Sequence, residues 1–357
     1  MRIGWILLIL VSFSGTLFAF NQTRDKDSVA RRNIYNNIDT TCIESCRNKL
    51  TLKLLLVSRF NSFSIKDKLT NQSLEYSINS KTSLGFGLSY KGIGIEFQIT
   101  PKALGNNKDD FKYGNTKMFS ISTSANSRRF IYDVYLRASQ GFHTTEGFKA
   151  PSDTSNLLIY LYRPDISNIS LGTEVVYIFN NKKFSSSAPY DFTQRQKRGA
   201  GSALLGTLFS LYTISADSII FPDSLKSRFA PEVQFKDAGS LTWGFSFGYT
   251  YTFVFGRKKN WFANIYTLPG LAVQQYYATN VYSEQTKSSV SLGIPFQFRC
   301  SIGVNCKNYY WGFSALSSNY TINTDKGVDF SYKYSCLRLY YGYRFGLKKE
   351  YFTKFLK

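Results

Sequence analysis

The most regular feature of this sequence is an alternation of large apolar residues with small or polar ones. It is clearest in segment 241–255, where every second residue is Leu, Trp, Phe or Tyr and those between are mostly Gly, Ser and Thr. Side chains of a strand alternate between two faces, so this period predicts β-strands. The pattern recurs at 84–90, 93–99, 290–298 and 337–347, and more weakly at 50–60, 116–125, 128–140, 168–180, 201–213, 260–276 and 308–320. We therefore expect about twelve strands, within roughly 10–14.

The composition of the two strand faces indicates which face points outwards. In a soluble sandwich or barrel the large residues face inwards and the outer face carries many charges. Here one face is almost wholly Phe, Tyr, Ile and Leu, and the other is Gly and Ser with isolated charges. A transmembrane barrel places such an apolar face against lipid, and it must close because lipid cannot satisfy a strand edge. The sequence predicts an all-β fold, a closed antiparallel transmembrane β-barrel over residues 49–347.

The connections between the expected strands support a barrel with two unlike ends. Short basic turns such as Lys91-Gly92 and Arg257-Lys258-Lys259 alternate with long polar stretches such as 61–80 and 141–167. This alternation is typical of the periplasmic and extracellular ends of outer-membrane barrels. Segment 184–213 departs from the pattern because it is too long for one strand. It is either a kinked strand or a segment folded into the lumen.

Both ends of the chain carry targeting features. A basic start, an apolar stretch and small residues near Ala19 predict a signal peptide at 1–20 rather than an uncleaved anchor. A periplasmic N-terminal segment (21–48) and a basic C-terminal tail (348–357) are expected to flank the barrel. Tyr340, Gly342, Phe345 and Leu347 have the spacing of the signal read by the barrel-insertion machinery. These features predict export to the outer membrane of a Gram-negative bacterium.

The net charge of the chain limits the classes of partner that are expected. The 357 residues carry a formal net charge of +21. A cytosolic protein this basic would suggest nucleic acid, but an exported one does not meet it routinely. Outer-membrane lipids and lipopolysaccharide, which are anionic, are the expected partners together with the insertion machinery, and the ligand is unknown. No metal site or phosphate-binding loop is evident, so no metal and no cofactor is expected.

Charged residues on the small-residue face are the first candidates for a site. Their parity predicts that they point into the lumen, where they would form either a selectivity lining or salt bridges that stiffen a narrow barrel. These lumen-facing candidates are Glu96, Asp133, Arg137, Glu174, Arg299, Arg338 and Arg344.

Two further groups of residues have a chemistry of their own. The cationic cluster of Arg195, Lys197 and Arg198 lies in the irregular segment and would bind an anion or form a solvated turn. Export permits disulfides, with Cys42, Cys46, Cys300 and Cys306 as candidates and Cys336 left over.

The sequence resembles an uncharacterised family of Bacteroidetes outer-membrane proteins, a domain family of unknown function. The residues that carry the resemblance include Gly85 to Phe97, Tyr113 to Lys117, Arg163-Pro164-Asp165 and, most distinctively, Gln194 to Gly206. The resemblance covers nearly all of the expected mature chain. It implies the fold and the compartment, and it supplies no activity.

These features favour a non-enzymatic outer-membrane barrel, either a narrow channel or a structural or binding barrel with a polar, mixed-charge lumen. Two alternatives stay open. One is an outer-membrane hydrolase of lipid or peptide that uses His143, the one histidine, as its base, although an ordinary solvated loop histidine is the simpler interpretation. The other is a secreted, soluble β-barrel that binds a ligand.

Overall fold

The computed structural model describes residues 38–90, 93–99, 110–146, 148–149, 158–222, 228–231, 234–280, 286–323 and 327–346. The expected signal peptide (1–20), most of the N-terminal segment (21–48), Leu347 and the basic tail (348–357) lie outside the described residues. Residues 1–40 and 41–357 form separate compact units. The fold described below is that of the second unit.

Nearly all of this unit is β-structure. Two small sheets pair β1 (Ile43–Ser45) with β11 (Gln194–Gln196) and β8 (Phe148–Lys149) with β9 (Leu158–Ile159), and the short helices are α4 (Asp110–Tyr113) and α5 (Ser187–Tyr190). No helix in the described ranges is long and apolar enough to cross a membrane. The main sheet has fourteen strands: β2 (Lys49–Asp67), β3 (Ser73–Ser77), β4 (Thr82–Tyr90), β5 (Ile93–Ile99), β6 (Lys117–Asn126), β7 (Phe130–Thr144), β10 (Tyr162–Ile178), β12 (Ala200–Ser215), β13 (Phe235–Phe255), β14 (Trp261–Asn280), β15 (Thr286–Gly293), β16 (Phe296–Asn305), β17 (Tyr309–Asn323) and β18 (Val328–Gly346).

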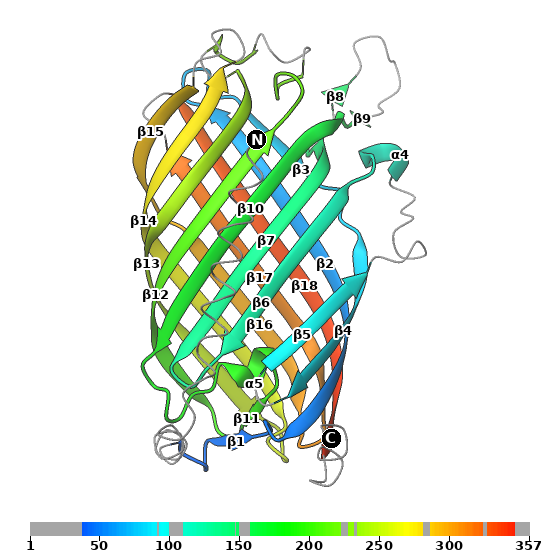
Figure 1. Ribbon diagram of the computed structural model, residues 1–357, viewed down its shortest axis with the longest axis vertical. Coiled ribbons are helices and arrows are strands. Elements are labelled where there is room, and N and C mark those ends of the chain that lie inside the picture. The colour runs from blue at the N-terminus through cyan, green and yellow to red at the C-terminus, as the bar shows by residue number, and fades with distance from the viewer. Residues whose placement is uncertain are drawn as a thin grey trace, which may run out of the picture. The chain divides into compact units, whose positions relative to one another are not determined.

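The main sheet closes on itself, as expected (Figure 1). Ten of its strands form the ring β18-β17-β16-β14-β13-β12-β10-β7-β3-β2, and antiparallel pairing of β18 with β2 closes it, from Val328 opposite Asp67 to Gly346 opposite Lys49. The other four strands, β4, β5, β6 and β15, pair off this path. The prediction of an all-β, antiparallel, closed barrel is confirmed, whereas the expected count of about twelve strands is not.

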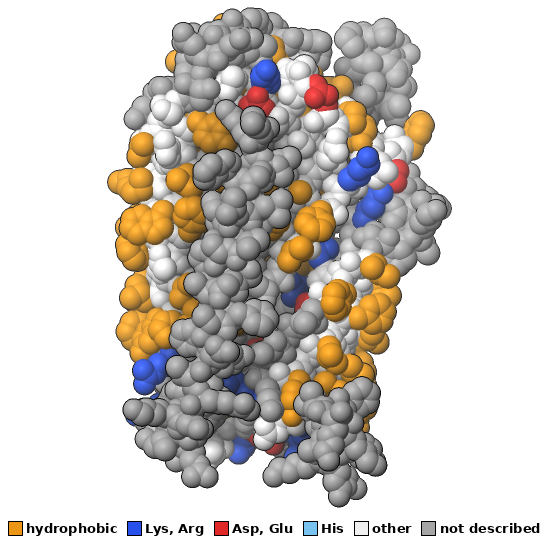
Figure 2. Space-filling view, in the orientation of Figure 1, with side chains coloured by type: hydrophobic (Ala, Val, Ile, Leu, Met, Phe, Trp, Pro, Cys, Tyr) orange, Lys and Arg blue, Asp and Glu red, His pale blue; other side chains and the backbone are white. Residues whose placement is uncertain are grey.

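The outer wall of the barrel is apolar, and the opposite face of its most regular strand, β13, carries small polar residues. Along β13, Trp243, Phe245 and Phe247 are 53%, 57% and 62% exposed, whereas Thr242 and Ser246 on the opposite face are buried. Figure 2 shows apolar side chains spread over the visible wall. The interior of a water-soluble protein would have these two sets reversed. The large face therefore points outwards, as the alternation predicts.

The two ends of the barrel differ in the length of their connections. At one end, called the short-turn end and lowest in Figure 1, β6 joins β7, β13 joins β14 and β16 joins β17 through tight turns. At the other, called the long-loop end, the connections after β7 and β12 are longer. The exception at the short-turn end is the stretch between β10 and β12, which holds α5 and β11.

A glycine on β18 makes room for an aromatic ring inside the short-turn end. Gly342 lies directly opposite Tyr310 of β17, and a Cβ atom on Gly342 would come 2.1 Å from Tyr310 Cζ. The Tyr310 ring is fully buried and stacks on Phe192 with ring centroids 4.1 Å apart. The glycine is therefore needed for this aromatic contact.

We expect Gly342→Ala to destabilise the barrel by about 1–3 kcal/mol, because the methyl group displaces the Tyr310 ring from its stack on Phe192. Urea unfolding of the protein refolded into phospholipid vesicles measures the change. Gly346→Ala is the matched control on the same strand, since no atom lies within 4 Å of its added Cβ. Equal unfolding midpoints for the two variants would contradict the packing role of Gly342.

Candidate functional site

A polar chamber of about 190 Å³ lies inside the barrel. Its wall is built by inward-facing residues of many strands, because the period of two places every second side chain of each strand in the lumen. Six of the seven lumen-facing candidates line this chamber: Glu96 on β5, Asp133 and Arg137 on β7, Glu174 on β10, Arg299 on β16 and Arg338 on β18. Lys53 of β2 joins them.

Arg299 holds two carboxylates on one side of the chamber. Its Nη2 lies 2.5 Å from Asp133 Oδ2 and 3.4 Å from Glu174 Oε2, and it also donates to Gln297 Oε1 at 2.8 Å. Asp133 and Glu174 are directly opposite in the β7–β10 register, so the backbone itself places the two carboxylates together. Arg299 and Glu174 are both buried. These ion pairs brace β7, β10 and β16 across the lumen.

A second charged group has more cations than carboxylates. Glu96 Oε1 lies 2.6 Å from Lys53 Nζ, and Glu96 Oε2 lies 3.7 Å from an Arg338 nitrogen. Arg59 also acts electrostatically on Glu96. The Arg338 side chain keeps 34% of its surface exposed although it points into the barrel. The guanidinium of Arg338 is therefore available to a further anion.

Arg137 is held by aromatic rings instead of a carboxylate. Its guanidinium carbon lies 3.9 Å from the ring centroid of Tyr135 and 3.5 Å from that of Tyr334. Within the described part of the chain it has no ion-pair partner, and its Nε has no hydrogen-bond partner. Stacking between two rings fixes the plane of the guanidinium and leaves its charge unpaired.

The floor of the chamber is a segment that folds into the short-turn end. Residues 184–199 follow β10 and carry α5, whose Ser187, Ala188 and Pro189 are buried. Tyr190 Oη donates to Asn264 Oδ1 at 2.6 Å. Tyr190, Asp191 and Thr193 line the chamber from below. Of the two alternatives for the irregular segment, the structure has the one in which it folds into the lumen, and we call residues 184–199 the plug.

Asp191 is the charged residue of the plug that faces the chamber. Burial raises the pKa of its carboxyl, and the hydrogen bonds that it accepts from the backbone and hydroxyl of Thr193 act in the opposite direction. Those hydrogen bonds are 2.9 Å and 2.8 Å long. They fix the turn that leads from α5 into β11.

Arg344 fastens the plug to the wall. It is 1% exposed and donates through Nε and Nη2 to the Phe192 carbonyl, at 3.0 Å and 2.7 Å. Nη2 also donates to Asn305 Oδ1 at 2.7 Å, and Nη1 donates to the Cys306 carbonyl. Phe192 itself has a positive φ of 61°, which costs a non-glycine residue energy. Arg344 points inwards as expected, but it anchors the plug and does not line the chamber.

The cationic cluster lies where β11 meets β1. Arg195 Nη1 lies 3.0 Å from Glu44 Oε2, and Arg195 Nη2 donates to Asn260 Oδ1 at 2.5 Å. The backbone of Lys197 donates to the Cys42 carbonyl, and Arg198 is exposed. Arg195, itself a residue of the plug, therefore links the plug to β1.

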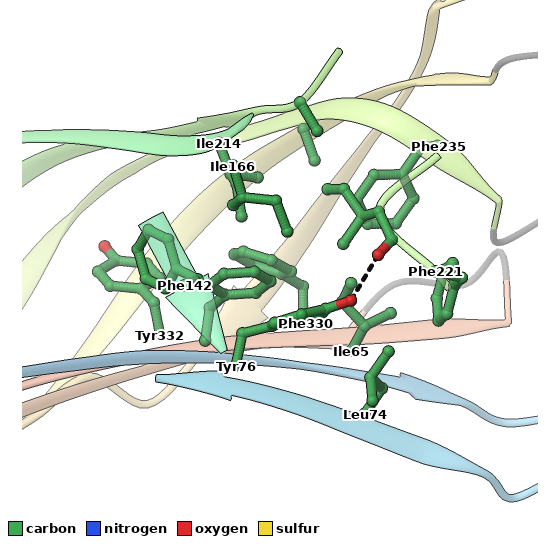
Figure 3. Packing of buried hydrophobic residues seen from close by; sticks show 14 of the residues in the cluster. Ile65, Leu74, Tyr76, Phe142, Ile166, Ile214, Phe221, Phe235, Phe330 and Tyr332 are labelled. Carbon is green, nitrogen blue, oxygen red and sulfur yellow. Dashed lines mark hydrogen bonds between the residues drawn. The ribbon is translucent and has the colours of Figure 1, made fainter. Parts of the chain in front are cut away.

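The ceiling of the chamber is aromatic. Tyr332 stacks on Tyr320 at 4.6 Å and on Tyr212 at 4.2 Å, and its hydroxyl lies 3.1 Å from Ser210 Oγ. Above these rings, a large cluster of buried apolar residues fills the long-loop end, including Phe63, Phe142 and Phe330 (Figure 3). The lumen is thus blocked by side chains on this side of the chamber as well.

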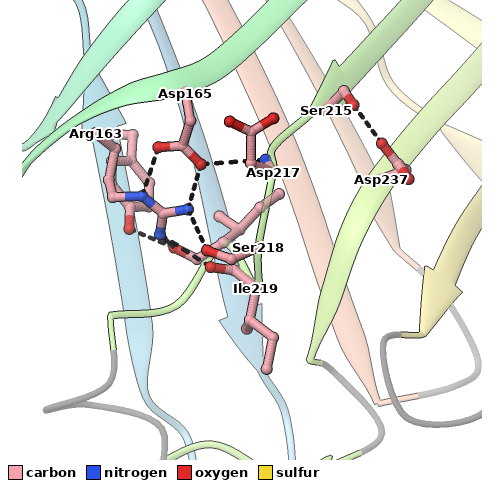
Figure 4. Close-up of polar contacts among 9 residues, drawn as sticks. Arg163, Asp165, Ser215, Asp217, Ser218, Ile219 and Asp237 are labelled. Carbon is pink, nitrogen blue, oxygen red and sulfur yellow. Dashed lines mark hydrogen bonds and ion pairs between the residues drawn. The ribbon is translucent and has the colours of Figure 1, made fainter.

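The connection after β12 folds over this cluster as a cap. Ile219, Ile220 and Phe221 are buried, and Tyr76 Oη donates to the Ile220 carbonyl at 2.6 Å. Arg163 Nη1 donates to the carbonyls of Ile219 and Ile220, at 2.9 Å and 3.1 Å. Asp165 pairs with Arg163 at 2.7 Å and accepts from the Asp217 backbone (Figure 4). The Arg163-Pro164-Asp165 motif therefore holds the cap.

His143 differs from its expected surroundings. It lies near the end of β7 and is 8% exposed, not solvated in a loop, because its ring packs against Tyr113 at 4.7 Å and Tyr160 at 6.5 Å. Its Nδ1 has no hydrogen-bond partner in the described residues. The prediction of a solvated loop histidine is wrong. The geometry around His143 also lacks the hydrogen-bonded Ser or Asp partner of a catalytic base within the described ranges.

The expected disulfides are not formed, and all five cysteines are free. Cys300 and Cys306 do not face each other across a turn. They lie along the same strand direction, roughly 20 Å of extended chain apart, whereas a disulfide needs Cα atoms within about 7 Å. Cys42 and Cys46 flank the extended strand β1 and are roughly 13 Å apart for the same reason. None of the four candidate cysteines therefore forms a disulfide in the structure.

Several residues in and around the chamber are not among the candidates that the sequence pattern indicates. Lys53 lies between Leu52 and Leu54, so its parity was a usable signal. Arg59 was hidden because β2 carries apolar residues on both faces near it. The plug residues follow no strand period, so only their tertiary contacts identify them. No group of three or more His, Cys, Asp or Glu side chains that could hold a metal lies in the described residues.

The fold and this site together define the class of protein. It is a closed antiparallel β-barrel with an apolar outer wall and a charged chamber enclosed between a plug and an aromatic ceiling. The chain belongs to the DUF4421 family, a domain of unknown function, whose family profile matches residues 37–345. The expected membership in an uncharacterised family is confirmed, and an origin in Bacteroidetes stays a prediction. No curated protein matches the sequence.

Several solved outer-membrane proteins are similar in outline. The outer membrane protease OmpT from Escherichia coli has a TM-score of 0.41 and 7% identity, over 85% of this chain and 98% of that one. The translocator domain of the autotransporter NalP from Neisseria meningitidis has a TM-score of 0.33 and 8% identity, over 89% and 95%. Ail, the attachment invasion locus protein of Yersinia pestis, has a TM-score of 0.23 and 12% identity, over 64% and 97%. Scores and identities this low add nothing to the strand pairing described above.

Proposed function

We propose that this protein is an outer-membrane barrel whose lumen serves as a binding chamber closed at both ends of the barrel. The membrane location is supported by the apolar outer wall, on which residues such as Phe245 and Phe247 are more than half exposed. A monomer in water rarely carries so much contiguous apolar surface. The expected signal peptide at 1–20 provides the route of export.

The number of membrane passes depends on whether two consecutive strands that pair with the same neighbour are counted once or twice. β3 and β4 both pair with β2, and β15 and β16 both pair with β14. Each of these pairs is one pass interrupted by a bend, at 78–81 and 294–295. On that count the fourteen strands make about twelve passes, an even number as in bacterial outer-membrane barrels.

The single observation that favours a binding chamber over a channel is the closure of the cavity on both sides. Below, Tyr190 and Phe192 of the plug lie in the lumen, where Tyr190 donates to Asn264 and Arg344 donates to the Phe192 carbonyl. Above, Tyr332 and the apolar cluster fill it. An ion crossing the barrel would have to displace both layers, whereas a ligand in the chamber would be surrounded by fixed charges.

The orientation of the barrel in the membrane assigns a partner to each of its two ends. Short turns face the periplasm in outer-membrane barrels, so the plug, Lys197 and Arg198 would lie at the inner leaflet. The two cations would then meet phospholipid phosphates, and lipopolysaccharide would meet the long-loop end. The β18 residues Tyr340, Gly342 and Phe345 would be read by the insertion machinery.

Conductance in planar bilayers tests the closed lumen. We expect the purified, refolded protein to insert without a stable open-channel current, because neither the plug nor the ceiling leaves a continuous aqueous path. Heat-modifiable migration on a gel confirms in the same sample that the barrel is folded. A steady, reproducible single-channel conductance from folded protein would overturn the closed-chamber proposal in favour of a narrow channel.

A further inference from the structure

The barrel wall has a break in backbone pairing between β5 and β6. Among the described residues β5 pairs only with β4, and β6 pairs only with β7, although the two strands are neighbours (Figure 1). Towards the long-loop end, the ring is closed by β3, whose Tyr76 and Ser77 pair with Thr144 and His143. Unpaired edges of Ile93–Ile99 and Lys117–Asn126 therefore face each other. We call this part of the wall the lateral slot.

A polar group of contacts bounds the lateral slot towards the long-loop end. Asn79 Nδ2 donates to Asp110 Oδ1 at 2.7 Å and to the Gly114 carbonyl at 2.8 Å. Lys81 Nζ lies 3.3 Å from Asp110 Oδ2 and donates to Asn115 Oδ1 at 2.7 Å. These contacts and the pairing of β3 with β7 close the wall on this side of the slot. Unpaired strand edges are costly in lipid, so such an opening needs a compensating occupant.

The lateral slot leads into the chamber. Ser122 and Ser124 of β6 and Glu96 of β5 line the cavity, so residues of both edges reach it. Ser122 lies opposite Tyr135 and Ser124 opposite Asp133, which places both serines on the inward face. They are nevertheless exposed, as is every residue from 121 to 125. Figure 2 shows charged side chains in this stretch of wall, between apolar ones.

The charges next to the lateral slot favour an anion. The Arg137 guanidinium lies 3.5 Å from the centroid of the Tyr334 ring, and the charges of Arg59 and Arg338 also act on Tyr334. The carboxylate that shares this region is Glu96, and it is already paired with Lys53 at 2.6 Å. Lys53, Arg59 and Arg338 act on this carboxylate, whereas Asp133 and Glu174 are paired with Arg299. Arginine binds phosphate and other planar or multidentate oxyanions with two parallel hydrogen bonds.

The outer faces beside the lateral slot favour an apolar chain. Phe97 and Ile99 of β5 are 69% and 59% exposed, and Phe119 and Ile121 of β6 are 54% and 58% exposed. The chamber itself, at about 190 Å³, is smaller than the roughly 300–1,000 Å³ of sites that enclose a whole small molecule. It has room for a compact polar group, and the remainder of the ligand has to lie outside, along these side chains.

We infer that the chamber receives the anionic headgroup of a membrane lipid through the lateral slot, while its acyl chains stay in the bilayer against Phe97, Ile99, Phe119 and Ile121. The headgroup contacts Arg137 and Arg338, and the lipid covers the two unpaired strand edges. This inference rests on the proposed closed chamber and adds its ligand class and its route of entry.

Native mass spectrometry of the detergent-solubilised barrel with dioleoylphosphatidylglycerol tests the inference. We expect one tightly bound lipid per barrel, and at least tenfold weaker binding for Arg137→Gln and for Arg338→Gln. The control Lys333→Gln removes an outward-facing cation of β18 and should bind as the unchanged protein does. Dioleoylphosphatidylcholine, whose headgroup has no net charge, should bind at least tenfold more weakly than the anionic lipid.

Variants that block the lateral slot test the route of entry separately from the recognition of the lipid's charge. Ser122→Phe places a ring on the inward face of the slot edge and should abolish lipid binding. Ala125→Phe should not, because Ala125 lies on the outward face of the same strand, opposite the exposed Tyr132, and does not line the chamber. Inorganic phosphate should compete only weakly, and phosphate that binds as tightly as the lipid would overturn the lipid assignment. Equal lipid binding by the Arg137, Arg338 and Lys333 variants, with the barrel still non-conducting, would overturn this inference alone. An open channel would instead overturn the proposed chamber.

Discussion

Replacing Arg299 by methionine is expected to destabilise the barrel by about 3–5 kcal/mol, since the substitution leaves one buried and one partly buried carboxylate without their cation. Asp133 and Glu174 are opposite each other in the sheet register and both contact Arg299 Nη2, at 2.5 Å and 3.4 Å. Burial makes an uncompensated charge costly, and methionine keeps much of the side-chain volume. Equilibrium unfolding in urea, with the barrel in phospholipid vesicles, measures the loss.

Two further variants show whether the cost comes from charge or from packing. Arg338→Met removes a cation from the same chamber, but its pairing with Glu96 is longer, at 3.7 Å, and more exposed, so we expect about 0–1 kcal/mol. Adding Asp133→Asn and Glu174→Gln to Arg299→Met should restore most of the stability, because amides need no counter-charge. A triple variant no more stable than Arg299→Met alone would show that the loss comes from packing.

Loosening the plug is expected to open the chamber to water. Arg344→Met removes the donors that hold the Phe192 carbonyl, Asn305 and Cys306, and each hydrogen bond from a charged group contributes about 1.5–3 kcal/mol. Phe192→Ala additionally removes the ring that stacks on Tyr310. Each change should favour local opening of the plug by more than about tenfold, since 1.4 kcal/mol corresponds to a factor of ten.

The thiol of Cys336 reports this opening. It lines the chamber and is 3% exposed. The experiment uses a variant in which the other four cysteines are replaced by serine. A charged maleimide should label Cys336 slowly when the plug carries no substitution. Labelling should be at least about tenfold faster with Arg344→Met or Phe192→Ala. Lys49→Met is the control, since Lys49 donates to Lys307 and Asn308 at the same barrel end without touching the plug. Equal labelling rates in all four proteins would refute a closing role for the plug.

The strand parity located the charged side chains of the chamber but not their partners. Asp133, Glu174 and Arg299 were each placed in the lumen from the period of two alone. Their mutual contact depends on the pairing of β7 with β10 and on the curvature of the sheet, which places β16 on the opposite side of the lumen. Neither is encoded in the spacing along one strand. For the same reason a selectivity lining and a set of bracing salt bridges could not be told apart from the sequence.

The plug and the cysteines show where local pattern is insufficient. Segment 184–213 was recognisable as irregular, because its length and composition break the strand period. Its conformation is set by contacts with residues more than a hundred positions away, such as Arg344 and Asn305. The candidate cysteines form no disulfide, because export permits disulfides but does not determine which thiols the folded sheet brings within bonding distance.

The lateral slot could not be predicted either. Segments 93–99 and 116–125 both alternate like their neighbours, and each was expected to pair on both sides. In the structure each of them pairs on one side only among the described residues, as β15 also does, and the serines of β6 are exposed. Hydrogen-bond partners between strands are a property of the assembled sheet, so an unpaired edge leaves no mark on the period of side chains.

The sequence by itself determined the strands, the outward direction of the apolar face and the inward direction of the charges. The reason is that the pleat alternates side chains strictly, so composition at every second residue is a direct record of the environment of each face. The tertiary structure alone decided that the lumen is filled at both ends, which charges meet, and where the wall stays open. Those outcomes depend on contacts between residues far apart in the chain, whose geometry exists only once the barrel has closed.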